Sequence, residues 1–145
     1  MAGMMAERQP FPFVSVRNAR GEVGLRPLLP ITLTYQDGSQ EAMGLLDTGA
    51  DVNVLPYRLG LALGAVWKDQ QTAIQLSGNL ANAEARGILL SAPVANFAPV
   101  RLAFAWTQAE NVPLILGQVN FFMAFDVCFF RSRNSFEIGP QSPAT

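Results

Sequence analysis

Residues 45–51, which read LLDTGAD, constrain the fold of this chain more than any other segment. Two leucines typical of a buried strand lead directly into Asp47, and the Thr48 and Gly49 that follow are common in turns. Gly49 permits a backbone geometry that a residue with a side chain would resist. The segment therefore predicts a strand that ends in a tight turn, where the carboxylate of Asp47 is presented.

Composition excludes several kinds of catalytic and metal site. The chain has no histidine, so it cannot build a Ser–His or Cys–His pair or bind zinc through imidazole. Its single cysteine, Cys128, excludes a thiolate metal cage and an intramolecular disulfide, and we expect it in the core. Phosphate-binding glycine loops and calcium loops are also missing. We therefore expect no metal and no cofactor, and hydrolytic chemistry would have to depend on carboxylates.

The size and charge of the chain limit its organisation and partners. Its 145 residues, half of them apolar, suit one domain, which we predict at residues 10–138 between flexible tails at 1–9 and 139–145. A net charge of −1 offers no basic face for nucleic acid, so we expect a peptide or protein partner. Without a secretory signal or an uninterrupted apolar span, we expect no membrane partner and, by default, a cytoplasmic location.

Short extended segments separated by turns predict an all-β, barrel-like domain. Residues 28–35 alternate, with the odd-numbered apolar side chains on one face, and Asp37 and Gly38 predict a hairpin turn before a return strand at about 40–46. Further strands are expected at 11–17, 52–55, 72–76, 80–90, 100–106, 113–116, 125–130 and 135–138. Short helices are expected at 56–63 and 117–124.

A loop between two of these extended segments is a candidate flap. Its composition suits a hairpin tip, and a loop that closes over a peptide would expel water from the reaction. An inert surface hairpin is the alternative interpretation. The predicted flap tip consists of Ser77, Gly78, Asn79 and Leu80.

From residue 28 to 138 the chain resembles the retropepsin-like aspartic proteases, single-domain relatives of the retroviral proteases that also occur in bacteria. The resemblance rests on LLDTGAD and on the segment LILG at 114–117, whose glycine lies 70 residues after Asp47. It implies a closed, barrel-like all-β fold with one or two short helices. It also implies an aspartic-type endopeptidase, a hydrolase acting on peptide bonds.

Only one Asp-Thr-Gly is present, whereas this chemistry needs two carboxylates close enough to share a proton. A homodimer would supply both, because twofold symmetry places the two copies of Asp47 opposite each other. Like charges about 3 Å apart cannot both ionise comfortably, so the pair would hold one proton at intermediate pH. A water molecule between them would attack the scissile carbonyl directly.

The resemblance also implies roles for the residues around Asp47. Thr48 would bond across the dimer axis and brace the two turns, while Gly49 and Asp51 would meet the main chain of the substrate. Apolar pockets would accept hydrophobic side chains on both sides of the cleaved bond. The residues that match the lining of these pockets are Leu45, Ala50, Val54, Val112 and Ile115.

One departure from the retroviral pattern follows Gly117. The retroviral enzymes have an arginine there that pairs with the aspartate matching Asp51, whereas this chain has Gln118. An amide offers two donors, so Gln118 could still hydrogen-bond to Asp51. The departure favours an alternative function, a catalytically weak peptide-binding or dimerisation module.

Simpler interpretations apply to individual residues. Asp47 could be an ordinary turn aspartate, and Asp51 a solvated or helix-starting carboxylate. Large aromatic side chains supply much of the buried area of a small domain, so they are expected in the core or in a subunit interface. This group comprises Trp67, Trp106, Phe121, Phe122, Phe125, Phe129 and Phe130.

Overall fold

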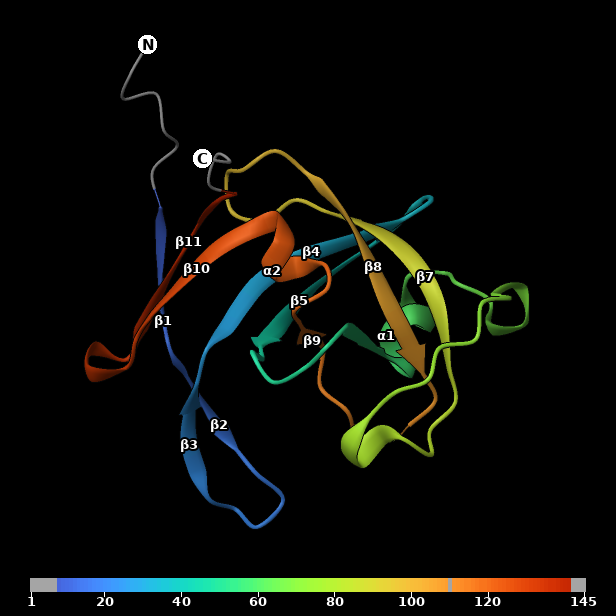
Figure 1. Cartoon of the computed structure of the whole chain (residues 1–145), viewed down its shortest axis with the longest axis horizontal. Helices are drawn as coiled ribbons and strands as arrows, with labels where there is room; N and C mark the ends of the chain where they lie inside the picture. The colour runs from blue at the N-terminus through green and yellow to red at the C-terminus, as the bar shows by residue number, and fades with distance from the viewer. Residues whose placement is uncertain (1–7, 110, 142–145) are drawn as a thin grey trace.

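A closed barrel of six strands forms the body of the protein in the computed structural model, which describes residues 8–109 and 111–141 (Figure 1). The predicted all-β, barrel-like fold is therefore confirmed. Around the barrel the order of the strands is β4, β5, β9, β6, β8 and β7. Their bounds are Leu28–Tyr35, Gly38–Leu46, Ile115–Leu116, Asn53–Pro56, Val100–Thr107 and Ala85–Ala92, in that order.

The β4–β5 hairpin follows the predicted alternation. Leu29, Ile31 and Leu33 are buried, and the even-numbered residues between them face outward or lie half-buried. The turn lies one residue earlier than predicted, because Tyr35 already pairs with Gly38 and leaves Gln36 and Asp37 as its central residues. Gly38 is required by packing, since a Cβ atom there would overlap the carbonyl oxygen of Leu63.

The helices are short. Helix α1, Tyr57–Ala62, begins after Pro56 and ends before Gly64, whose φ of +89° is favourable for glycine, much as predicted. Helix α2, Phe121–Ala124, is shorter than the predicted 117–124, because the preceding residues continue the backbone ladder from β9. Three single 3₁₀ turns complete the helical content of the described residues: η1 Trp67–Asp69, η2 Gly78–Leu80 and η3 Arg131–Arg133. None of the helices in this part of the chain could cross a membrane.

The N-terminal region differs most from the prediction. Instead of one strand at 11–17 there are two, β1 Gln9–Pro12 and β2 Val14–Arg17, because Phe13 donates its N–H to Asn134 and breaks the run. Strand β1 pairs with β11, which pairs in turn with β10. Strand β2 pairs with β3, which the sequence did not predict. The strands not yet given bounds are β3 Val23–Arg26, β10 Phe125–Phe130 and β11 Ser135–Pro140. Residues 1–7 and 142–145 of the predicted tails lie outside the described residues. The predicted tail bounds differ from the structure at Gln9, which begins β1, and at residues 139–140, which end β11.

The prediction of two extended segments on either side of the flap tip is also wrong in part. Within 72–76 only Ala73 forms a bridge, to Arg86, and β7 begins at Ala85 rather than at residue 80. The Gln75 side-chain amide donates to the carbonyls of Leu76 and Ala81, at 3.1 and 2.8 Å. A side chain thus takes the place of strand pairing and closes the segment into a compact turn.

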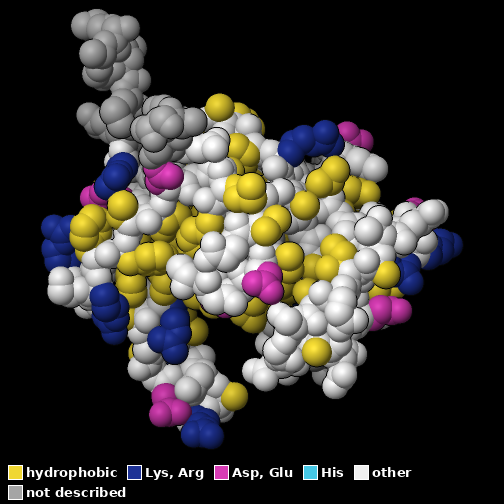
Figure 2. Space-filling view, viewed as in Figure 1, with side chains coloured by type: hydrophobic (Ala, Val, Ile, Leu, Met, Phe, Trp, Pro, Cys, Tyr) yellow, Lys and Arg dark blue, Asp and Glu magenta, His cyan; other side chains and the backbone are white. Residues whose placement is uncertain are grey.

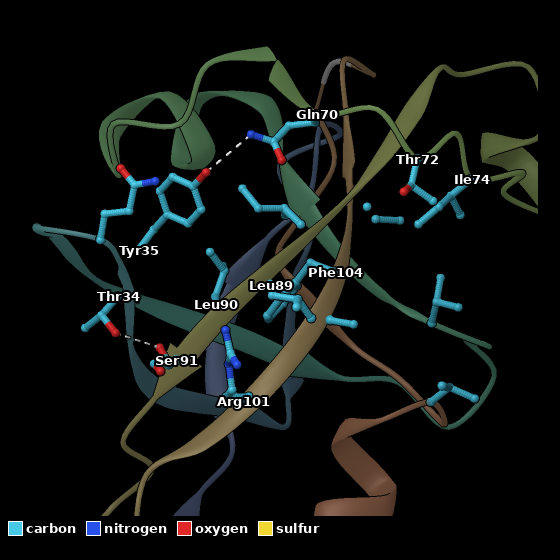
Figure 3. A pocket seen from close by; sticks show the side chains of 17 residues that line it. Thr34, Tyr35, Gln70, Thr72, Ile74, Leu89, Leu90, Ser91, Arg101 and Phe104 are labelled. Carbon is cyan, nitrogen blue, oxygen red and sulfur yellow. Dashed lines mark hydrogen bonds between the residues drawn. The ribbon is translucent and has the colours of Figure 1, made fainter. Parts of the chain in front are cut away.

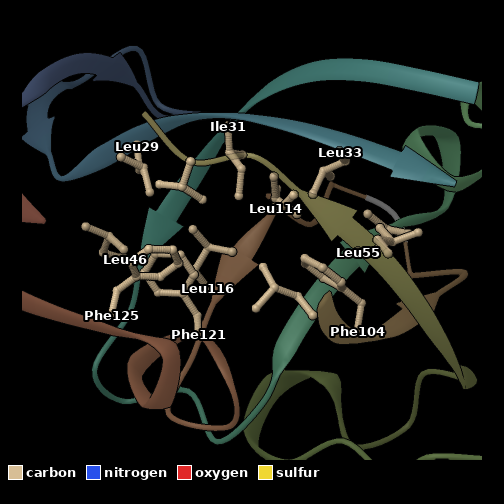
Figure 4. Close-up of a cluster of buried hydrophobic side chains, with 14 of the residues drawn as sticks. Leu29, Ile31, Leu33, Leu46, Leu55, Phe104, Leu114, Leu116, Phe121 and Phe125 are labelled. Atoms are coloured by element: carbon tan, nitrogen blue, oxygen red, sulfur yellow. The ribbon is translucent and has the colours of Figure 1, made fainter. Parts of the chain in front are cut away.

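Two apolar clusters fill the domain. The larger lies inside the barrel, where Leu116 and Phe104 meet Phe121 and Phe125 from the region of α2 (Figure 4). The smaller cluster consists of Val54, Leu76, Ala85 and Ala105, with Val52, Ile74, Leu80, Val112 and Ile115 packed against it.

The aromatic residues and Cys128 divide between core and surface. Trp106 is fully buried; Tyr57 stacks on it, and the edge of Trp67 meets it at 5.1 Å between ring centroids. Phe129, in contrast, is 38% exposed. Cys128 is only half-buried, so the prediction of a core cysteine was wrong.

Candidate active site

The predicted turn is present at the end of β5. Asp47 donates its N–H to the carbonyl of Leu116 at 3.0 Å, and its own carbonyl accepts the N–H of Ala50 at 3.1 Å. Its carboxylate atom Oδ1 accepts the N–H of Gly49 at 2.9 Å. Asp47 is half-buried, whereas Thr48 and Gly49 are exposed. The turn therefore holds the carboxylate in a fixed position at the surface of the domain.

Gly49 fits this turn for a different reason from the one predicted. Its φ lies outside the left-handed region, so the backbone conformation does not itself require glycine. A Cβ atom there would approach Asp47 Oδ1 to 3.3 Å, which is tighter than most such contacts. The missing side chain leaves room for the carboxylate.

The second motif, LILG, lies directly behind the turn. Strand β9 runs parallel to β5, and Leu45 donates its N–H to Leu114 at 2.8 Å. Beyond β9, Gln118 donates its N–H to Ala50 at 2.9 Å. A Cβ atom on Gly117 would lie 2.6 Å from the carbonyl oxygen of Val52, so only glycine fits. The two motifs, 70 residues apart in sequence, form one hydrogen-bonded unit.

A buried asparagine ties this unit to the barrel. Asn53, which is 0% exposed, accepts the N–H of Gly117 at 2.8 Å. Its amide donates to the carbonyl of Ala103 at 3.0 Å and to Asn120 Oδ1 at 3.2 Å. Sequence reasoning did not identify Asn53 or Asn120, although a polar residue within the apolar run VNVL was an available signal.

Gln118 does not take the place of the retroviral arginine in the way we predicted. Its side-chain amide donates to the main-chain carbonyl of Thr48 at 2.8 Å rather than to the carboxylate of Asp51. Asp51 is exposed, and its carbonyl accepts the N–H of Val119 at 2.8 Å. Gln118 therefore braces the turn through the backbone.

A cleft of about 700 Å³ opens beside Asp47. The turn forms one side, the tip of the predicted flap forms another, and apolar residues from β6, β9 and the loop before β9 form the rest. Gln75 and Leu76 continue the flap wall, and Asn111 and Pro113 extend the loop. The predicted residues that line this cleft are Asp47, Gly49, Ala50, Asp51, Val54, Ser77, Gly78, Asn79, Leu80, Val112 and Ile115.

Two predicted residues lie outside the lining. Leu45 is partly buried and pairs with Ile115 in the sheet, and Thr48 lies on the exposed surface of the turn. A second hollow, of about 770 Å³, lies over β7 and β8, and Asp47 is not among the residues that line it (Figure 3). Arg101 is the one charged residue among those that line this outer hollow, which therefore offers no pair of carboxylates.

Comparison with solved structures identifies the fold. The chain is similar to a retropepsin-like aspartic protease from Rickettsia conorii, with a TM-score of 0.56, 13% identity, and coverage of 92% of this chain and 94% of that chain. The chain has a retropepsin-like fold. EIAV protease in complex with the inhibitor HBY-793 is also similar, with a TM-score of 0.48, 20% identity, and coverage of 71% and 88%. No family model and no curated protein matches the sequence.

The retropepsin-like fold accounts for the position of the cleft. The parallel pair of β5 and β9 brings LLDTGAD against LILG, and the segment before β7 brings the predicted flap tip to the same space. Within residues 8–109 and 111–141, no three Cys, Asp or Glu side chains group as metal ligands. The site offers one carboxylate-bearing turn and an apolar wall for each chain.

Proposed function

We propose that this protein is an aspartic-type endopeptidase that works as a homodimer. The observation that carries the proposal is the shared cleft, in which the Asp47 turn, the tip of the flap and an apolar wall line one space of about 700 Å³. A peptide has a polar main chain and side chains of varied size, and this combination of surfaces suits both.

The exposure of the turn supports dimerisation. Thr48 and Gly49 are exposed in the single chain, so nothing in the described part of the protein seals the turn from a second copy. A twofold axis beside Asp47 would bring its carboxylate to the same residue of the partner. Thr48, which is exposed and does not line the cleft, would then brace the two turns across the axis.

The proposed mechanism uses one proton and one water molecule. The ionised Asp47 takes a proton from the water, which attacks the scissile carbonyl, while the protonated Asp47 of the second copy donates a hydrogen bond to the carbonyl oxygen. Two carboxylates about 3 Å apart repel each other when both are ionised, so the pair of Asp47 side chains would hold a single proton. No acyl-enzyme forms, so the chemistry requires neither a histidine nor a nucleophilic thiol.

The lining of the cleft sets the expected substrate preference. Val54 is 3% exposed and forms a firm apolar wall together with Val112 and Ile115. Burial of substrate side chains against this wall would stabilise the complex by about 25 cal/mol for each Å² of apolar surface removed from water. We therefore propose hydrophobic residues flanking the cleaved bond.

Cleavage of casein at mildly acidic pH tests this function. The wild-type protein should cut it, a statine-type mimic of the tetrahedral state should block cleavage, and Asp47→Asn should lower kcat/KM by about 10²- to 10⁴-fold. Asp47→Asn is nearly isosteric, so loss of activity would not reflect a lost fold. Undiminished cleavage by this variant would overturn the proposal.

The contact of Gln118 favours a second candidate function. Residue 118 is glutamine where the retroviral pattern has arginine, and its amide donates to the carbonyl of Thr48, so it gives Asp51 no cationic partner. If turnover needs an ion pair between an arginine and Asp51, this protein would be a weak catalyst that mainly binds peptides or dimerises. A folded dimer that binds the statine-type mimic yet cleaves no peptide would favour this module over the protease.

A further inference from the structure

The β2–β3 hairpin projects from the domain, and we refer to its residues 14–26 as the arm (Figure 1). Its two strands pair with each other and, in the described chain, with no other strand. Residues 15–23 are all exposed. Figure 2 shows the arm as a separate lobe at the bottom of this face of the molecule.

The tip of the arm is ordered by its own hydrogen bonds. Asn18 Oδ1 accepts the N–H groups of Arg20 and Glu22, both at 2.9 Å, and the N–H of Asn18 donates to the carbonyl of Glu22 at 2.8 Å. Arg17 donates to the carbonyl of Gly21 at 2.6 Å, and Gly21 has a φ of +82°. The arm is thus preorganised, which lowers the entropy cost of binding a partner.

The arm nevertheless leaves apolar groups and strand edges uncovered. Val16 is 38% exposed and Val23 is 57% exposed. They lie on opposite faces of the hairpin, because Val16 pairs with Gly24 and Val23 pairs with Arg17. A lone two-stranded hairpin is marginal in water, and unpaired edges invite another chain. These features are typical of an element that packs against a second molecule.

The base of the arm lies next to the catalytic turn. Pro27, the residue after β3, accepts the N–H of Leu46 at 3.1 Å, and Leu28 pairs with Leu45. Asp47 follows immediately. In the homodimer of the proposed function, on which this inference rests, Asp47 lies at the twofold axis. The arm therefore leaves the barrel beside the partner.

Charge also favours a second copy as the partner. The arm carries Arg17, Arg20 and Arg26 against the single acid Glu22. The turn beside the axis carries Asp47 and Asp51. The ion pair between Arg8 and Glu137 involves neither carboxylate of the turn, and Asp51 is exposed, so a cation from a second chain can reach Asp51. We propose that the arm of each protomer clasps the second copy of the chain beside its Asp51-bearing turn.

Sedimentation equilibrium of arm variants tests this proposal. The double variant Val16→Ser/Val23→Ser and the single variant Arg20→Glu should each raise the dimer dissociation constant about tenfold or more. Added salt should weaken the wild-type dimer more than the Arg20→Glu dimer. Matched controls are Val66→Ser, at a valine 44% exposed next to α1, and Arg58→Glu, at an exposed arginine on α1. Neither control should change the constant.

Hydrogen exchange on the wild-type protein gives a test that needs no variant. Amides of residues 15–23 should gain protection when the protein concentration rises through the dimer dissociation constant. A wild-type protein that stays monomeric, or a dimer whose arm amides gain no protection and whose arm variants keep the wild-type constant, would overturn the proposal.

The outcomes separate the arm from the protease. If the arm variants keep the wild-type dissociation constant while Asp47→Asn abolishes cleavage, the arm proposal fails and the proposed function stands. If the arm variants weaken a dimer that cleaves no peptide, the arm proposal stands and the protease fails. Circular dichroism of each variant confirms that it remains folded.

Discussion

Among single residues, the candidate site depends on a few positions whose close contacts make substitution costly. Asn53 joins three neighbouring segments through one amide, and Gly117 allows the chain after β9 to pass close to the backbone at Val52. Neither residue lines the cleft. They act by positioning the turn that carries Asp47, so we expect substitutions there to affect both stability and activity.

Asn53→Ala should lower the free energy of unfolding by about 2–4 kcal/mol, because it leaves the buried N–H of Gly117 without its partner and removes the part-buried bond to the carbonyl of Ala103. Urea denaturation measures this loss. Asn96→Ala, at an exposed asparagine, is the control and should stay within about 0.5 kcal/mol of the wild type. Equal stabilities for the two variants would contradict the role assigned to Asn53.

Gly117→Ala should destabilise the protein by about 3 kcal/mol, because its Cβ atom would lie 2.6 Å from a backbone oxygen that cannot move alone. Gly64→Ala is a matched comparison. Its φ is +89° but its Cβ atom would meet nothing within 4 Å, so only backbone strain of about 1 kcal/mol applies. In thermal unfolding, Gly117→Ala should have a lower melting temperature than Gly64→Ala. The reverse order would exclude steric crowding as the reason for glycine at position 117.

At the level of secondary-structure elements, the predicted flap is held by a side chain rather than by a strand ladder. Gln75 bonds to carbonyls on both sides of the 3₁₀ turn Gly78–Leu80. Leu80 and Ile74 pack against the small cluster that backs the cleft. The predicted flap tip is therefore anchored at its base and exposed at Ser77, Gly78 and Asn79, and this arrangement would suit a segment that closes over a substrate.

Gln75→Ala should lower kcat/KM for peptide cleavage about tenfold without a large change in overall stability, because it frees the flap tip but leaves the barrel intact. Limited proteolysis should cut the variant faster within residues 75–81. Gln71→Ala, at an exposed glutamine four residues earlier, serves as the control. Unchanged kcat/KM in Gln75→Ala would mean that the order of this segment does not matter for turnover.

At the scale of the whole molecule, each chain contains half of the proposed catalytic site. The described residues supply one Asp47 turn, one cleft and one arm, and the proposed dimer would place the two copies of each around an axis beside the turn. Activity should therefore depend on protein concentration, because dilution below the dimer dissociation constant removes the site itself.

Mixing equal amounts of wild-type protein and Asp47→Asn should reduce activity to about one quarter of that of wild type at the same total concentration, because random pairing leaves about one dimer in four with two native turns. The measurement is the rate of casein cleavage after the subunits have exchanged. An equal amount of serum albumin in place of the variant is the control. A fall to one half would indicate that each chain acts alone.

The amino-acid pattern was sufficient to predict the features that depend on neighbouring residues. Strand β4 and strand β10 follow the predicted bounds, and helix α1 lies between the Pro56 and Gly64 that were expected to start and stop it. These predictions succeed because alternation, proline and glycine act within a few residues. The turn at Asp47 belongs to the same group, since its Asx-type bond to Gly49 spans two residues.

Features that depend on distant partners became clear only in the folded domain. Gln118 bonds to Thr48, 70 residues away, and Asn53 bonds to Gly117, 64 residues away. The split between β1 and β2 likewise follows from the bond that the N–H of Phe13 donates to the carbonyl of Asn134. Each of these bonds satisfies a polar group that only the folded barrel brings within reach, so local pattern could not predict them.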